Sequence, residues 1–162
     1  MAHDAGLVLR PAQPDDVEAI AVLWHAGWRD GHAGHVPAEL HRHRRLADFR
    51  DRVPPRLSAT TVGTRDGRLV GFVTVREDEV EQVYVVGPAR GTGVAGTLLA
   101  AAEHAVAARF DSAWLAVAVG NTRARRFYTR HGWRDAAALD YPAEAGTAPV
   151  LVACRRYEKR VR

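Results

Sequence analysis

The chain has little cysteine and no long apolar run. Its single cysteine, Cys154, cannot form a disulfide within the chain. No stretch of about 18 apolar residues occurs, which excludes a membrane-spanning helix. Residues 1–6 lack the basic and then apolar pattern of a signal peptide. From these absences we expect a cytoplasmic protein with no membrane partner.

Lysine is almost absent as well. Lys159 is the one lysine among 23 basic residues, so the other 22 are arginines. The net charge of +4 and the isoelectric point of about 9.8 favour polyanionic ligands. DNA and a phosphorylated cofactor both fit that charge, but no DNA-reading helix or base-stacking motif is recognisable. We therefore expect no nucleic-acid partner, and the arginine bias instead suggests a GC-rich genome.

Length and apolar periodicity predict the fold class. With 162 residues and 47% apolar composition, we assign residues 1–162 to one domain with a core at about 7–157. The patterns predict an α/β (α+β) fold, ordered β-α-α-β-β-β-α-β-α-β-β around a central mixed sheet of about seven strands. The predicted strands are 7–10, 60–65, 69–76, 79–86, 112–119, 135–141 and 150–157. The predicted helices are one beginning at Pro14, then 37–57, 93–110 and 121–131.

A strand, a glycine loop and a helix start follow one another directly over residues 83–99. Glycines let backbone N–H groups approach a ligand, and a helix N-terminus adds about half a positive charge, so this order predicts a phosphate or pyrophosphate site. The spacing from Gly91 to Gly96 also matches G-x-G-x-x-G. We reject that dinucleotide interpretation because Asp111 precedes the next strand instead of ending it, and because a hairpin meander precedes the loop. No Gly-Lys-Ser/Thr occurs, which excludes a Walker loop.

Three features together resemble the GNAT superfamily of acetyl-CoA-dependent N-acetyltransferases. The loop reads Arg90-x-x-Gly93-x-Ala95 after a Val-Tyr-Val strand, residues 121–133 read N-x-x-A-x-x-F-Y-x-x-x-G-W, and the order of elements agrees. The resemblance spans about residues 7–157. It implies the GNAT fold, acetyl-CoA as co-substrate, and transfer of its acetyl group to a primary amine by direct attack in a ternary complex. It leaves the acceptor open, as a small molecule or a protein amine.

The resemblance also implies roles for individual residues. Val83 and Val85 would pair with the pantetheine arm, and an N–H near Val83 would hold the developing oxyanion. Asn121 would either bind that arm or cap its helix, and Tyr128 would protonate the departing thiolate as general acid. The pyrophosphate would bind backbone N–H groups of Arg90, Gly91, Thr92, Gly93, Val94, Ala95, Gly96 and Thr97.

Two acids on the strand before the loop are candidates for the general base. By resemblance Glu81 is the first choice and Glu79 the second, acting directly or through water. Regular alternation would put both on one face of the sheet with Val83 and Val85. The alternative is a pair of solvated edge charges. Partial burial that raises their pKa would favour the catalytic role.

The acceptor side is expected from the first two helices and the last strands. Candidate substrate contacts are Trp24, Trp28 and His25. The histidines His25, His32 and His35 either line a substrate mouth or face solvent. The spacing of the eight histidines gives no clear set of metal ligands, so no metal is expected. Cys154 lies in an apolar strand and is expected to be an inert core residue. Either a solvated face or a site for an acidic substrate is formed by Arg42, Arg44, Arg45, Arg50 and Arg52.

Another class of function remains as an alternative, a non-catalytic acyl-CoA-binding sensor of the same fold. The Arg90 motif together with Glu81 and Tyr128 argues against it. A nucleic-acid binder would require DNA binding that falls steeply with salt. The sequence leaves open the acceptor, the acyl chain length and whether the protein is a homodimer, as many relatives are.

Overall fold

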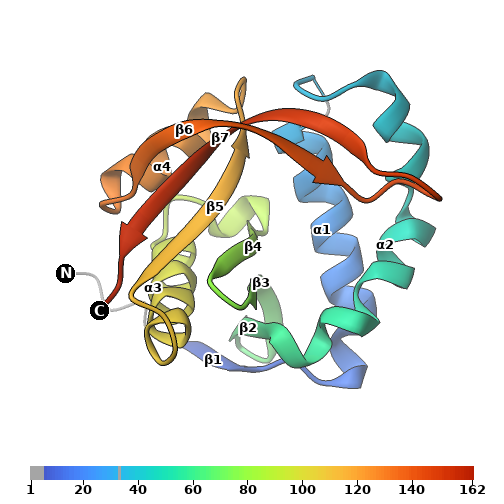
Figure 1. Cartoon of the computed structure of the whole chain (residues 1–162). Helices are drawn as coiled ribbons and strands as arrows, with labels where there is room; N and C mark the ends of the chain where they lie inside the picture. Colours follow the sequence, from blue (N-terminus) through green and yellow to red (C-terminus); the bar gives the residue numbers. More distant parts are fainter. Residues whose placement is uncertain (1–5, 33) are drawn as a thin grey trace.

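Seven strands form one mixed sheet with helices on both faces in this computed structural model, which describes residues 6–32 and 34–162 (Figure 1). The sheet order is β1-β2-β3-β4-β5-β7-β6, and the predicted fold class is confirmed. None of the described helices is long and apolar enough to cross a bilayer. The strands are β1 (Leu7–Pro11), β2 (Thr60–Arg65), β3 (Arg68–Arg76), β4 (Glu79–Val85), β5 (Ser112–Ala118), β6 (Arg134–Ala143) and β7 (Val150–Arg160). The helices are α1 (Val17–His32), α2 (Leu46–Arg52), α3 (Val94–Ala107) and α4 (Thr122–Arg130).

Glycine-containing turns set several of these boundaries. The hairpin between β2 and β3 turns at Asp66 and Gly67, whose φ angles of 52° and 76° are the positive values that a tight hairpin of this type requires. Gly132, with φ of 84°, follows His131, the C-cap of α4, and ends the helix in the left-handed conformation. The sequence predicted both the hairpin turn and the end of the helix.

The predicted helix over residues 37–57 is instead three short pieces. Two 3₁₀ helices, Ala38–His43 and Pro54–Ala59, flank α2, which has only 7 residues. Pro54 and Pro55 have no N–H to donate, so α-helical bonding stops there. Arg44 leaves helical geometry, with φ of −131° and ψ of 38°. The first break therefore falls at Arg44, whose side chain is buried.

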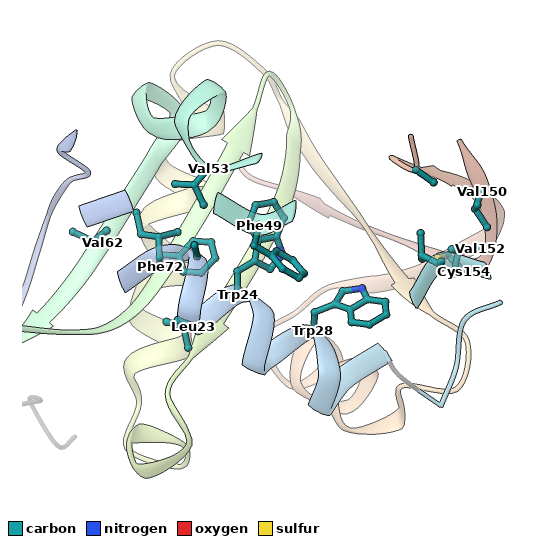
Figure 2. Close-up of a cluster of buried hydrophobic side chains, with 14 residues drawn as sticks. Leu23, Trp24, Trp28, Phe49, Val53, Val62, Phe72, Val150, Val152 and Cys154 are labelled. Atoms are coloured by element: carbon teal, nitrogen blue, oxygen red, sulfur yellow. The ribbon is translucent and has the colours of Figure 1, made fainter. Parts of the chain in front are cut away.

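The core consists of two apolar clusters on opposite faces of the sheet. Helices α1 and α2 cover one face (Figure 1), where Trp24, Phe49 and Phe72 are the largest fully buried side chains (Figure 2). The Trp24 and Phe49 rings meet edge to face with centroids 5.1 Å apart. Helix α3 covers the other face, with Leu98 and Leu99 fully buried.

Strands β4 and β5 are parallel neighbours that diverge. Only Glu79 and Trp114 are paired between them. The N–H of Val86, just past β4, donates to a carbonyl of β3 (2.9 Å). By alternation the N–H groups of Val83 and Val85 point the other way, toward β5. Because β5 has moved away at this level, those groups face an open gap.

A bulge in β4 changes the side on which its residues lie. The register of β4 against β3 skips Glu81, which is the extra residue. Val80 and Val83 both pack in the α3 cluster, although they are an odd number of positions apart. Glu79 and Glu81 line a cavity on the α1 side instead. The prediction that both acids share a face with Val83 and Val85 is therefore wrong, because the bulge inserts one residue between the two pairs.

Candidate active site

A groove of about 1000 Å³ lies between the diverging strands and continues past the glycine loop. Val83 and Val85 of β4 line one side, and Ala116 and Val117 of β5 line the other. Residues of α4, among them Tyr128, also line it. The groove therefore offers free backbone groups of β4 along its length.

The glycine loop at one end of the groove carries unpaired N–H donors. Gly91 and Gly93 have φ angles of 75° and 90°, which glycine adopts without strain. Within the described chain no acceptor is bonded to the N–H of either glycine. The N–H groups of the first turn of α3, over residues 94–96, have no partner inside the helix. Together with the helix dipole, these donors form a site for an anion.

A second cavity, of about 330 Å³, lies on the α1 side of β4 and is called the acceptor cavity below. Trp24 and Trp28 of α1 line it, as does Tyr141 of β6. It meets the groove at residues that line both spaces, namely His32, Glu81, Gln82, Tyr84 and Ala116. The two spaces are therefore separated by a few side chains of β4 and its neighbours.

Residues 19–133, which include β4, the glycine loop and α4, match the sequence model of the Acetyltransferase (GNAT) family. The chain belongs to the GNAT acetyltransferase family. Its seven-stranded mixed sheet is typical of the GNAT fold. No curated protein sequence gave a significant match to the chain.

Solved structures of other GNAT proteins share this fold. A GCN5-related N-acetyltransferase from Rhodopseudomonas palustris superimposes with a TM-score of 0.72 at 23% identity, covering 96% of both chains. The PaiA N-acetyltransferase from Thermoplasma acidophilum, solved with coenzyme A, gives 0.68 at 17% identity over 95% of this chain and 98% of that one. YncA from Salmonella typhimurium, solved with acetyl-CoA, gives 0.69 at 17% identity over 98% and 95%. At these identities the likeness shows the fold alone.

Most of the residues predicted to bind the co-substrate of this GNAT protein line the groove. Thr92 and Val94 do not. The N–H and the hydroxyl of Thr92 both donate to the carbonyl of Ala89 (3.3 and 2.5 Å), and the Val94 side chain is fully buried, although its N–H belongs to the free first turn of α3. Asn121 caps α4 by accepting a hydrogen bond from the N–H of Ala124 (3.2 Å). Those that line the groove are Val83, Val85, Arg90, Gly91, Gly93, Ala95, Gly96, Thr97 and Asn121.

Tyr128 projects from α4 into an aromatic cluster beside the groove. Its ring centroid lies 5.2 Å from that of Phe127 and 6.2 Å from those of Trp133 and Tyr157. Burial raises the pKa of its phenol, which is therefore protonated at neutral pH. A neutral phenol on the groove wall can donate a proton or a hydrogen bond.

Glu81 is held by two arginines at the junction of the two spaces. Its Oε1 accepts from Nε of Arg56 (2.5 Å), and its Oε2 accepts from Nη1 of Arg76 (2.9 Å). The Glu81 side chain is only 4% exposed. Arg56 also donates to Glu144 (2.5 Å), from the segment after β6. Sequence reasoning missed the pairing of Glu81 with Arg56 because the two residues lie 25 positions apart in the chain.

Glu79 has a different environment in the acceptor cavity. Its Oε2 accepts a hydrogen bond from the Tyr141 hydroxyl (2.7 Å), and among the described residues its Oε1 has no hydrogen-bond partner. Burial raises the pKa of Glu79, and the bond from Tyr141 only partly offsets this effect. Glu79 therefore accepts a proton more readily than an ordinary glutamate, and one of its oxygens is available for it.

The aromatic residues of α1 partly match the predicted substrate contacts. Trp24 and Trp28 line the acceptor cavity, whereas His25 lines neither space and packs on Phe49 with ring centroids 5.5 Å apart. His32 lines both spaces and stacks on Trp28 (6.0 Å). Burial lowers the pKa of His32 to about 4, so it is neutral at pH 7. Its spacing of four from Trp28 places it on the same helical stripe, a signal that was present in the sequence.

We assign no chemical role in the site to the remaining candidate groups. Within residues 6–32 and 34–162, no cluster of three His, Cys, Asp or Glu side chains could hold a metal ion. Cys154 lines the acceptor cavity but is only 6% exposed, and burial raises its pKa to about 11, so its thiol is protonated. Asp111 pairs with Arg162 (3.4 Å) and lines neither space.

Proposed function

We propose that this GNAT protein transfers the acetyl group of acetyl-CoA to a primary amine by direct attack in a ternary complex. The observation that carries the proposal is the meeting of two spaces at β4. One offers an anion site and free strand N–H groups, and the other offers carboxylates that suit an amine. Direct attack requires both reactants side by side, and the shared lining at Glu81 and Tyr84 provides that proximity.

The groove fits acetyl-CoA, which would supply the activated acetyl thioester. The loop N–H groups around Gly91 and Gly93 would bind the pyrophosphate, and the facing N–H and C=O groups of Val83 and Val85 would bind the pantetheine arm. The N–H of Val83 would then hold the oxyanion that develops when the amine attacks. Two relatives with this fold, PaiA and YncA, were solved with coenzyme A and acetyl-CoA respectively, which supports the choice of ligand.

We assign the role of general base to Glu79, reversing the order that the sequence suggested. Both oxygens of Glu81 already accept hydrogen bonds from guanidinium groups, whereas Glu79 has a free oxygen and a raised pKa. Glu79 would take a proton from the ammonium form of the acceptor, through a water molecule where the distance requires it. Glu81, at the junction, would attract and orient the ammonium by its charge.

Tyr128 is proposed as the general acid. After the new C–N bond forms, the C–S bond breaks, and the Tyr128 hydroxyl gives its proton to the sulfur of the leaving group. The first amine proton, taken up at Glu79, passes to solvent. The nitrogen loses a second proton as the amide forms, and this proton returns to Tyr128 through solvent. The overall exchange yields an amide and a thiol, and no covalent bond to the protein forms.

The test is thiol release from acetyl-CoA across a panel of primary amines. We expect at least one amine to be acetylated, with kcat falling about 10²–10⁴-fold in Glu79→Gln and less in Glu81→Gln. Tyr128→Phe should lower kcat while leaving acetyl-CoA binding unchanged, because it removes only the hydroxyl. Acetyl-CoA that raises the melting temperature without thiol release from any amine would favour the sensor alternative. An unchanged melting temperature at millimolar acetyl-CoA would rule out both acetyl transfer and the sensor alternative.

A further inference from the structure

The acceptor cavity holds more positive than negative charge. Its lining includes the four arginines Arg44, Arg52, Arg56 and Arg76, and the three glutamates Glu79, Glu81 and Glu144. His32 adds no charge at pH 7, since burial lowers its pKa to about 4. One positive charge is therefore left without a counter-charge in the cavity lining.

Arg44 is the arginine that lacks a carboxylate partner. The other three each pair with a glutamate of the cavity. Arg44 is 6% exposed, and its Nη1 donates to the backbone carbonyls of His43 (2.8 Å) and Glu144 (2.7 Å). Its Nε is buried and has no hydrogen-bond partner within the described chain. The guanidinium is thus fixed in position by two carbonyls and only partly satisfied.

A buried guanidinium without a counter-charge is costly to the fold. Removing one charge from water without pairing it costs several kcal/mol in general, and here burial lowers the pKa of Arg44 to about 10, which still leaves it charged at pH 7. The same guanidinium lies 5.9 Å from the Trp28 ring, on the wall of the cavity. An anion bound in the cavity would supply the missing counter-charge.

We propose that the acceptor is a small amino carboxylate whose carboxylate binds Arg44. The proposal rests on acetyl transfer as the function of the same site. A single unpaired positive charge matches a carboxylate, whereas a phosphate monoester carries about −1.5 to −2 charges at pH 7. Glu79 and Glu81 provide the opposite charge for the amino group, so the cavity is complementary to a zwitterion.

The size of the cavity and the chemistry of arginine fit the same ligand. A volume of about 330 Å³ lies at the small-molecule end of binding sites. A guanidinium binds a carboxylate with two parallel hydrogen bonds, which a lysine cannot copy. Arg52 lies 4.3 Å from the Trp24 ring in the same cavity and has only one, longer contact to Glu144 (3.3 Å), so it is the second candidate to hold the carboxylate.

The first experiment measures binding without turnover. Trp24 and Trp28 line the cavity, so their fluorescence reports a bound ligand. We would titrate the protein, saturated with coenzyme A, with the standard amino acids, their primary amides and the corresponding decarboxylated amines. At least one amino acid should bind about 10- to 100-fold more tightly than its amide and its decarboxylated amine, the range that one charge-assisted pair provides.

Variants then assign the effect to Arg44. Arg44→Gln should abolish the preference for the carboxylate, and Arg44→Lys should restore only part of it. Arg42→Gln is the matched control, since Arg42 is an exposed neighbour that lines neither space. Retained coenzyme A binding in each variant would show that the fold is intact.

The outcomes separate this inference from the proposed function. The carboxylate site would be overturned if amino acids and their amides bound equally, or if no panel member bound. It would also be overturned if Arg44→Gln weakened the binding of amino acids and of their amides to the same extent. Thiol release from amines without preference for a carboxylate would overturn it too, while leaving acetyl transfer standing. Carboxylate binding that depends on Arg44 with no thiol release from any compound would leave the site standing and remove acetyl transfer.

Discussion

Replacing Gly27 by alanine tests how closely α1 sits on β4. A Cβ at Gly27 would lie 2.2 Å from Cδ1 and 2.8 Å from Cε1 of Tyr84, whose ring packs beside Phe72 with centroids 5.7 Å apart. Alanine gains about 1 kcal/mol of helix propensity over glycine, but overpacking costs about 1–3 kcal/mol. Because the contact is so short, its cost should lie at the upper end of the range for overpacking. After the gain in helix propensity, we expect the free energy of unfolding to fall by about 2 kcal/mol. For a chain of this length the melting temperature should fall by about 4–8 °C.

Scanning calorimetry measures this shift, and two further variants isolate its cause. Gly31→Ala is the matched control on the same helix, because its Cβ would meet only the end of the flexible Asn121 side chain, at 3.2 Å. In a Tyr84→Ala background the clash is removed, so Gly27→Ala should then raise the melting temperature by its helix propensity. A melting temperature that stays level or rises when Gly27→Ala is made in the wild-type chain would refute the packing argument.

Four further predictions follow from the site. The pKa of His32 is lowered from 6.5 to about 4, so the free energy of unfolding should decrease by up to about 3 kcal/mol as the pH falls through that range. Urea titrations at stepped pH should show that this free energy depends less on pH in His32→Gln than in the wild type. The same pH dependence in both proteins would contradict the assignment. Asn121→Ala removes the cap of α4 and should cost about 1 kcal/mol by thermal unfolding, whereas Asn121→Asp should retain it. Because a base must be ionised, kcat/KM should fall as the pH drops through the raised pKa of Glu79, and a pH profile unaltered by Glu79→Gln would assign the limb to another group. Cys154 should resist a thiol reagent at pH 8 until the chain is unfolded, and labelling at the rate of a free thiol would show that it is exposed.

The order and limits of most elements could be predicted because local signals set them. Asp66-Gly67 requires a turn whatever surrounds it, and Gly132 ends a helix through its own backbone conformation. The glycine loop could be predicted for the same reason, since Gly91 and Gly93 adopt positive φ angles that glycine takes without strain. Such features need no knowledge of the rest of the fold.

The inward turn of Arg44 and the partners of Glu81 could not be predicted in that way. Burial of a charged residue depends on carbonyls and carboxylates from distant segments, as the contact of Arg44 with the carbonyl of Glu144 shows. The bulge left one trace: Val80 and Val83 are apolar but an odd number of positions apart, which regular alternation does not allow for one face. The alternation of apolar and polar residues alone does not show whether such a break comes from a bulge or from a position that faces solvent.

The bulge in β4 has a consequence for how this strand tolerates change. Substitution of Glu79 or Glu81 alters one side chain on one face of the sheet. Deletion of Glu81, the extra residue, would instead restore regular pairing and leave Val80 opposite Val75 and Gln82 opposite Thr74, as they are now. A residue inserted or deleted in β4 after the bulge would shift the rest of the strand by one place and move its side chains to the opposite face of the sheet. The length of β4 is therefore constrained more tightly after the bulge than at Glu81 itself.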